Sequence, residues 1–120
     1  MDSTEKKYDL EERTLAFAHR VNAYVNGLPR TISNIENGKQ LVRSAGSVGA
    51  NYIEANDGLS RRDFLMRVKI SKKEAKESIF WLNLSQPEKE LETEKEALIL
   101  ECTELMKILG AIIKKVQPGG

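Results

Sequence analysis

Residues 40–55 read Gln-Leu-Val-Arg-Ser-Ala-Gly-Ser-Val-Gly-Ala-Asn-Tyr-Ile-Glu-Ala and carry two helical periodicities at once. Apolar side chains recur at intervals of three and four residues, which predicts the buried face of an α-helix; they are Leu41, Ala45, Val48, Tyr52 and Ala55. Polar side chains recur at the same intervals on an adjoining face, at Arg43, Ser47, Asn51 and Glu54. Two glycines in the middle of a helix cost about 1 kcal/mol each relative to alanine. Close packing against a neighbouring helix is therefore expected to offset them.

A second helix is predicted to follow after a very short turn. The sequence Asn-Asp-Gly at 56–58 is expected to end the first helix, with Gly58 suited to the left-handed conformation of a helix C-terminus. Ser60 is expected to cap the next helix through its side-chain hydroxyl. A turn this short makes the two helices antiparallel neighbours.

Counting outward from this turn brings the polar face of the first helix against polar positions of the second. Arg43 is expected opposite Glu74. Ser47 is expected opposite Ser71, and both Asn51 and Glu54 close to Arg67. These positions would form a half-buried polar seam made of Arg43, Ser47, Asn51, Glu54, Arg67, Ser71 and Glu74. Buried polar groups of this kind set helix register and oligomeric state, and the alternative is that the seam recognises a ligand or a partner.

The remaining sequence predicts two further amphipathic helices, and no segment alternates with the period of two that is typical of a strand. The expected helices span residues 9–26, 31 or 33 to 55, 61–85, and 91 or 93 to 116. Weak helix formers around Gly38 leave open a break in the second helix, although one continuous helix is preferred. The predicted fold is an all-α, up-down-up-down four-helix bundle. One domain is expected at residues 8–116, between flexible tails at 1–7 and 117–120.

Composition excludes several classes of protein. With 120 residues the chain fits one domain, and its net charge of +1 gives no overall attraction to nucleic acid or membrane. No run approaches the roughly 20 apolar residues of a membrane span, and no signal peptide is recognised at the N-terminus. Cys102 is the single cysteine and suits a reducing compartment. We therefore expect a cytoplasmic protein that does not contact membranes.

Catalytic chemistry is not expected from these residues. His19 is the only histidine, and no cysteine or carboxylate stands near it at the spacing of metal ligands. Ser44 and Ser47 have no histidine close in sequence to activate them. Glu74 and Glu77 lack the Glu-x-x-His pairs of di-metal bundles. The sequence predicts no enzyme, no cofactor and no metal.

Charge is unevenly distributed along the second half of the chain. Basic residues gather on the third helix, and the candidate nucleic-acid-binding residues are Arg61, Arg62, Lys69, Lys72, Lys73 and Lys76. Acidic residues dominate from residue 88 to residue 104. The two sets could neutralise each other between neighbouring helices or between subunits. Alternatively, the basic helix binds phosphate without reading sequence.

Apolar residues exceed what a four-helix core needs. Tyr52, Phe80 and Trp81 are candidates for an interface, because adjacent large side chains on one helix point in different directions. Large exposed apolar patches usually mark interaction sites. This surplus predicts a homo-oligomer.

Two motifs carry a resemblance to a known family. They are Gln40-Leu41-x-Arg43-Ser44-x-x-Ser47-Val48-x-x-Asn51-Tyr52-x-Glu54, and Asp63-Phe64 followed by Ile70, Glu74, Glu77 and Trp81-Leu82. In these residues the chain resembles the family of bacterial four-helix bundle proteins whose founding members are encoded in intervening sequences of large-subunit (23S) ribosomal RNA genes. The resemblance implies a bundle assembled as a ring-shaped homo-oligomer, commonly a pentamer. A related branch, the accessory proteins of diversity-generating retroelements, binds a reverse transcriptase and nucleic acid.

The two functional hypotheses come from different classes of protein. The first is a non-enzymatic, homo-oligomeric scaffold or interaction protein of the intervening-sequence type, whose partners would be copies of itself and RNA, DNA or a nucleic-acid-processing protein. The second is a sequence-independent RNA- or DNA-binding protein that uses the basic face of the third helix.

Overall fold

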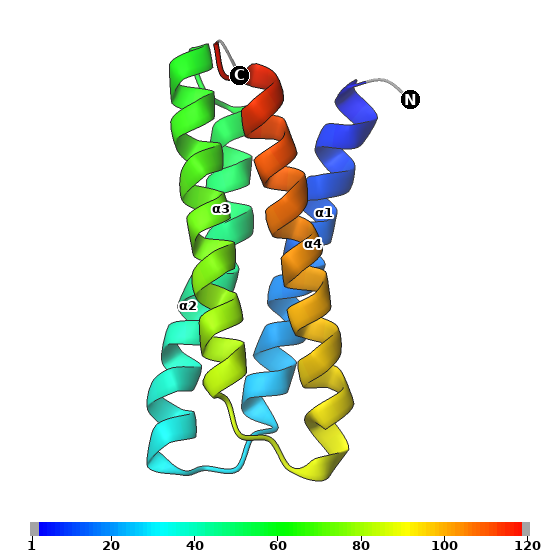
Figure 1. The fold of residues 1–120 in the computed structure, drawn as a ribbon, viewed down its shortest axis with the longest axis vertical. Helices are drawn as coiled ribbons and strands as arrows, with labels where there is room; N and C mark the ends of the chain where they lie inside the picture. The colour runs from blue at the N-terminus through cyan, green and yellow to red at the C-terminus, as the bar shows by residue number, and fades with distance from the viewer. Residues whose placement is uncertain (1–2, 119–120) are drawn as a thin grey trace.

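Four helices pack side by side and antiparallel in the computed structural model of the chain (Figure 1). The structure describes the backbone of residues 3–118 and the side chains of residues 9–118. The elements are α1 (Ser3–Asn26), α2 (Ile32–Asn56), α3 (Arg61–Leu84), a short 3-10 turn η1 (Lys89–Leu91) and α4 (Glu92–Val116). Within residues 3–118 there is no strand, so the prediction of an all-α four-helix bundle is confirmed.

The first helix begins earlier than predicted. Residues 1–7 were expected to form a tail, but α1 starts at Ser3. Glutamate and lysine at positions 5–7 are good helix formers and extend the helix without apolar periodicity. Residues 1–2 and 119–120 of the two expected tails lie outside the described residues.

Hydroxyl side chains cap α2 and α3. The Thr31 side chain accepts a hydrogen bond from the backbone N–H of Asn34 at 3.1 Å. Ser60 accepts one from the backbone N–H of Asp63, also at 3.1 Å. Each cap satisfies a donor that the first turn leaves free. Thr31 is therefore the cap of the second helix.

The second helix is continuous, and two of its glycines face α1. No break occurs near Gly38, where a Cβ atom would lie 3.0 Å from Cγ1 of Val25. At Gly49 a Cβ atom would lie 2.8 Å from Oγ1 of Thr14. The missing side chains let α1 approach α2 closely, which is the packing that offsets their low helix propensity. Gly46 does not follow the prediction of close packing, because it is exposed and no atom of a neighbouring helix lies within 4 Å of its Cβ position.

The turn between α2 and α3 corrects one prediction. Gly58 does not adopt the left-handed conformation. Its N–H instead donates to the Ala55 carbonyl oxygen at 3.0 Å, and a Cβ atom on Gly58 would lie 3.0 Å from that same oxygen. The glycine is used for a close approach of the backbone.

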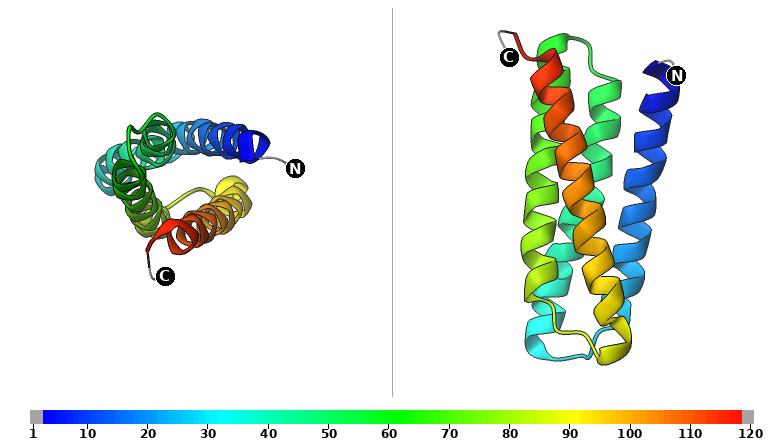
Figure 2. Two further views of the ribbon diagram at one scale, coloured as in Figure 1. Left: turned by 90° about the horizontal axis from the view of Figure 1, so that it is seen from above. Right: turned by 45° about the vertical axis from the view of Figure 1, so that its right-hand side comes forward.

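The core runs along the inner faces of all four helices. Its fully buried members include Phe17, Val21, Tyr24, Leu41, Val48, Val68, Ala75, Leu82, Leu98, Cys102, Leu105 and Leu109. Seen from above, α1 and α4 stand at the two ends of an open arc, and they diverge toward the end of the bundle where both termini lie (Figures 1 and 2). None of the described helices is both long and apolar enough to cross a bilayer.

Candidate functional site

The polar seam lies between α2 and α3. The Arg43 guanidinium lies 3.4 Å from Glu74 and 3.3 Å from Glu77. About two helical turns from Arg43 along α2, Nη1 of Arg67 donates to Oδ1 of Asn51 at 3.2 Å. These pairs stand where the short turn places them.

Two members of the expected seam are arranged differently. Ser71 does not meet Ser47; its hydroxyl is fully buried and donates to the Val48 carbonyl oxygen at 2.6 Å. Ser71 lies on the core-facing side of α3 and therefore meets the core-facing stripe of α2. Glu54 is exposed and forms no ion pair with Arg67 among the described side chains.

One fully buried polar contact between α2 and α3 was not predicted from the sequence. The hydroxyl oxygens of Ser44 and Ser78 lie 2.8 Å apart, and both residues are fully buried. The Ser78 hydroxyl also lies within hydrogen-bonding distance of the Glu74 carbonyl oxygen, at 2.9 Å. The signal was present, because Ser71 and Ser78 are seven residues apart and therefore share one helix face.

The two carboxyl groups beside Arg43 differ in protonation behaviour. Burial raises the pKa of Glu74, and the neighbouring Glu77 raises it further, whereas Arg43 lowers it. The pKa of Glu77 is lowered, chiefly by its hydrogen bond with Glu74 and then by Arg43. The same arginine therefore contacts two carboxyl groups of different acidity, and the more buried one, Glu74, is the weaker acid.

The basic residues of α3 divide between two faces. Arg62, Lys69, Lys73 and Lys76 are exposed and recur at helical spacing with Met66 and Phe80; we call this row the basic stripe. Lys72 leaves the row and lies over α4, where its Nζ would be 3.6 Å from a Cβ atom on Gly110. Arg61 stands at the start of the helix. Among the side chains that the structure describes, none of these cations pairs with a carboxylate.

The acidic residues of α4 are shared between α1 and solvent. Glu101 binds Arg13 at 2.8 Å, and Glu94 binds Arg20 at 3.0 Å. Glu92, Glu96 and Glu104 are exposed around Leu100 on the outer side of α4; we call this row the acidic stripe. Among the described side chains, no glutamate of α4 forms an ion pair with a lysine of α3, so the structure does not show the neutralisation within one chain that was considered as an alternative.

The expected apolar interface is only partly at the surface. Tyr52 is 4% exposed and belongs to the core, which corrects its assignment as an interface residue. It shares the buried stripe of α2 with Val48. Phe80 is 57% exposed, and its ring packs edge-on against the half-buried ring of Trp81 with centroids 5.0 Å apart. Leu100, which the sequence reading did not select, is 69% exposed.

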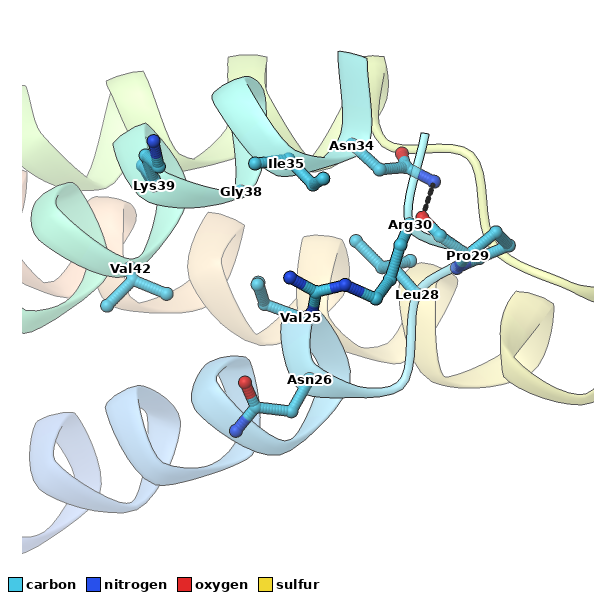
Figure 3. A pocket seen from close by; sticks show the side chains of 10 residues that line it. All are labelled: Val25, Asn26, Leu28, Pro29, Arg30, Asn34, Ile35, Gly38, Lys39 and Val42. Carbon is cyan, nitrogen blue, oxygen red and sulfur yellow. Dashed lines mark hydrogen bonds between the residues drawn. The ribbon is translucent and has the colours of Figure 1, made fainter. Parts of the chain in front are cut away.

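A hollow of about 350 Å³ lies between the end of α1 and the start of α2 (Figure 3). Its lining is mainly aliphatic, from Val25, Leu28, Ile35 and Val42, with Arg30 and Lys39 as its charged members. No carboxylate or histidine lines it.

Groups with chemical reactivity are sparse elsewhere in the described chain. His19 is exposed, and no three His, Cys, Asp or Glu side chains within the described residues gather to hold a metal ion. Burial raises the pKa of the Cys102 thiol to about 12, and its Sγ donates to the Ala75 carbonyl oxygen at 3.1 Å. Cys102 is thus a core residue that stays protonated.

Comparison with known proteins identifies the family. A model of the 23S rRNA-intervening sequence protein family matches residues 6–111, which is most of the chain. The chain belongs to this family. No protein with a curated description matches it.

A solved relative of the intervening-sequence protein supports the fold. The chain is 31% identical to a protein of unknown function from the S23 ribosomal protein family of Bacteroides thetaiotaomicron VPI-5482. The similarity covers 91% of this chain and 98% of that one, with a TM-score of 0.75. The family resemblance drawn from residues 40–82 is thereby confirmed.

Proposed function

We propose that this chain is a non-enzymatic scaffold protein that assembles into a ring-shaped homo-oligomer of about five copies, the number implied by the family resemblance. The observation that carries the proposal is the exposure of large apolar side chains on the outer sides of α3 and α4. Phe80 is 57% and Leu100 69% exposed, and Met66 and Leu84 are close to half exposed.

The physical argument is the cost of this exposure. Burying a phenylalanine or leucine side chain is worth about 1.5 to 3 kcal/mol relative to leaving it in water. Scattered apolar residues are ordinary on a surface, but here they lie within charged rows of opposite sign on neighbouring helices. An apolar centre with a polar rim is the usual composition of a protein interface. The buried thiol of Cys102 is compatible with the cytoplasmic location that we propose.

Light scattering coupled to size exclusion tests the proposal, with absorbance recorded at 260 and 280 nm. A protein-only peak at about five times the chain mass of 13.5 kDa is the expected result. A monomer that persists at high concentration would contradict the scaffold.

The second candidate is sequence-independent binding of RNA or DNA, directly or together with a nucleic-acid-processing protein. The observation that favours it is the basic stripe, whose four cations have no carboxylate partner among the described side chains. In this candidate the basic stripe stays free to contact phosphate, and an assembly that repeats the free stripe would add avidity.

Fluorescence anisotropy with labelled RNA and DNA of several sequences tests this candidate. Affinity should fall steeply with salt and depend little on sequence, because each cation that neutralises a phosphate releases counterions. Absence of binding at low salt, or a strong sequence preference, would contradict it.

A further inference from the structure

We infer that copies of this chain bind one another through two different faces, the basic stripe of α3 on one copy and the acidic stripe of α4 on the next. The inference rests on the proposed self-association and names the surfaces that carry it. Three observations lead to it: the spacing of the two rows, the direction of their charges and their heights along the bundle.

The two rows are continuous on their helices and face away from the core. On α3 the exposed row is Arg62, Met66, Lys69, Lys73, Lys76 and Phe80, at alternating intervals of four and three. On α4, Glu96, Leu100 and Glu104 follow at intervals of four, opposite the buried row that contains Leu98, Cys102 and Leu105. Each row therefore combines like charges with at least one large apolar side chain.

The charges of the two rows are opposite and form no ion pair among the described side chains, although Lys73 contributes to the field around Glu77. The glutamates of α4 that turn toward α1, Glu94 and Glu101, are paired there with arginines. Glu96 and Glu104 have no such partner among the described side chains, although Glu104 contributes to the field around Arg13. On α3, Glu77 lies beside the basic stripe but pairs with Arg43. A second copy supplies the complementary charge for both rows.

The heights of the residues match along the bundle. The hydrogen bond from Cys102 to the Ala75 carbonyl oxygen sets the level at which antiparallel α3 and α4 meet. Lys73 and Glu104 both lie two residues from this level toward the same end of the bundle, which is about 3 Å for each. Phe80 and Leu100 both lie toward the other end, within about one helical turn of each other.

Matched heights favour a ring over a filament. When α3 of one copy rests on α4 of the next without any shift along the bundle axis, Lys73 meets Glu104 at the same height and Phe80 lies within about one helical turn of Leu100. A head-to-tail contact without such a shift closes into a ring, whereas a contact with a shift builds a helical filament. Lys107 lies near the level of Lys69, so like charges would face each other there and the favourable part of the contact ends at this level.

Charge exchange tests the pairing of faces. Lys73→Glu with Lys76→Glu should weaken association by about a hundredfold, and Glu96→Lys with Glu104→Lys should do the same, because like charges would then meet across the interface. A chain that carries all four changes keeps its net charge and should assemble within about threefold of the original affinity, because its charges are merely interchanged. Sedimentation velocity at several concentrations measures each association, and circular dichroism reports the helix content.

The matched control is Glu88→Lys with Glu90→Lys, which makes the same change in net charge at exposed positions outside the acidic stripe. It should assemble as the original chain does. If the original chain assembles and neither double charge reversal weakens its association, the pairing of these two faces is wrong. A four-residue exchange variant that fails to assemble would contradict the pairing in the same way. Either result leaves the proposed scaffold intact. A monomeric original chain would overturn both. If the basic stripe bound phosphate, the four-residue exchange would abolish that binding but restore assembly. Recovery of assembly without phosphate binding would therefore distinguish the contact between copies from a nucleic-acid site.

Discussion

The junction of α2 with α3 and the junction of α1 with α4 are built from different polar chemistry. The first has short hydroxyl side chains at its centre, such as Ser44 and Ser78, that are fully buried and touch across the helices, and keeps the ion pairs of Arg43 at its edge. The second uses long ion pairs, such as Arg13 with Glu101, at the edge of the bundle. Short polar side chains hold two helices close, whereas long charged ones bridge helices that diverge (Figure 2).

The energies of the two junctions should differ accordingly. A buried hydrogen bond contributes about 0.5 to 1.5 kcal/mol, and leaving one partner unsatisfied costs more. An ion pair at the surface contributes about 0 to 1 kcal/mol. We therefore expect stability to be concentrated between α2 and α3.

Enlarging a side chain at the α2–α3 junction should have the largest effect. Ser78→Leu adds volume at a fully buried position and removes the partner of Ser44. Overpacking of this kind should lower the free energy of unfolding by about 2 to 3 kcal/mol. Urea denaturation measures it, with Asn83→Leu on the exposed side of the same helix as control. Equal stability of the two variants would mean that the junction is not tightly packed.

Removing one hydroxyl from the same junction should have an intermediate effect. Ser71→Ala deletes the hydrogen bond to the Val48 carbonyl oxygen without adding volume. A loss of about 1 kcal/mol in the free energy of unfolding is expected. The same denaturation curves measure this change, and Ser47→Ala, whose hydroxyl is half-buried, is the matched control. A larger loss of unfolding free energy for Ser47→Ala than for Ser71→Ala would mean that Ser47, not Ser71, carries the stabilising hydrogen bond.

Breaking the α1–α4 ion pair should cost less. In a double-mutant cycle with Arg13→Ala and Glu101→Ala, the coupling energy should stay below about 1 kcal/mol. It should shrink further in high salt, because the Arg13 side chain is 40% exposed. A coupling energy above that of the buried hydroxyls would contradict the comparison.

The smallest expected effect is a dependence of stability on pH from Glu74. Its folded-state pKa lies above the usual 4.5, mainly through burial. The folded chain therefore binds this proton more tightly than the unfolded chain, and the resulting stability is present below pH 4.5 and lost as pH rises through the folded-state pKa. The lowered pKa of Glu77 acts in the opposite direction. Thermal melts from pH 4 to pH 7 should show that Glu74→Gln removes the loss, whereas Glu36→Gln, at an exposed site, leaves it unchanged.

Local sequence patterns predicted those features that depend on near neighbours in the chain. The period of the apolar residues gave the helices, and the short turn at 57–60 set the register that brings Arg43 to Glu74. The same register could not separate Ser47 from Val48 as the partner of Ser71, because adjacent residues differ only by rotation around the helix.

Features that depend on distant parts of the chain were harder to predict. The pairing of Glu94 and Glu101 depends on α1, which is far away in sequence. The periodicity of a sequence shows that a helix has a polar face, but it does not show which helix packs against that face. The acidic stripe therefore became visible only after the glutamates that contact α1 were known.

Asn34 gives the two ends of the bundle different freedom of motion. Its buried amide group donates to the carbonyl oxygens of Pro29 and Gln86 and accepts from the N–H of Gln86, so it fastens the α1–α2 loop to the segment between α3 and α4. At the opposite end, where α1 and α4 diverge, α1 is held by single side-chain contacts, such as the 2.7 Å hydrogen bond that Asn56 donates to Glu11. Local opening of the molecule would pivot about Asn34, and amide hydrogen exchange along α1 should slow steadily from the region of Leu10 toward Tyr24.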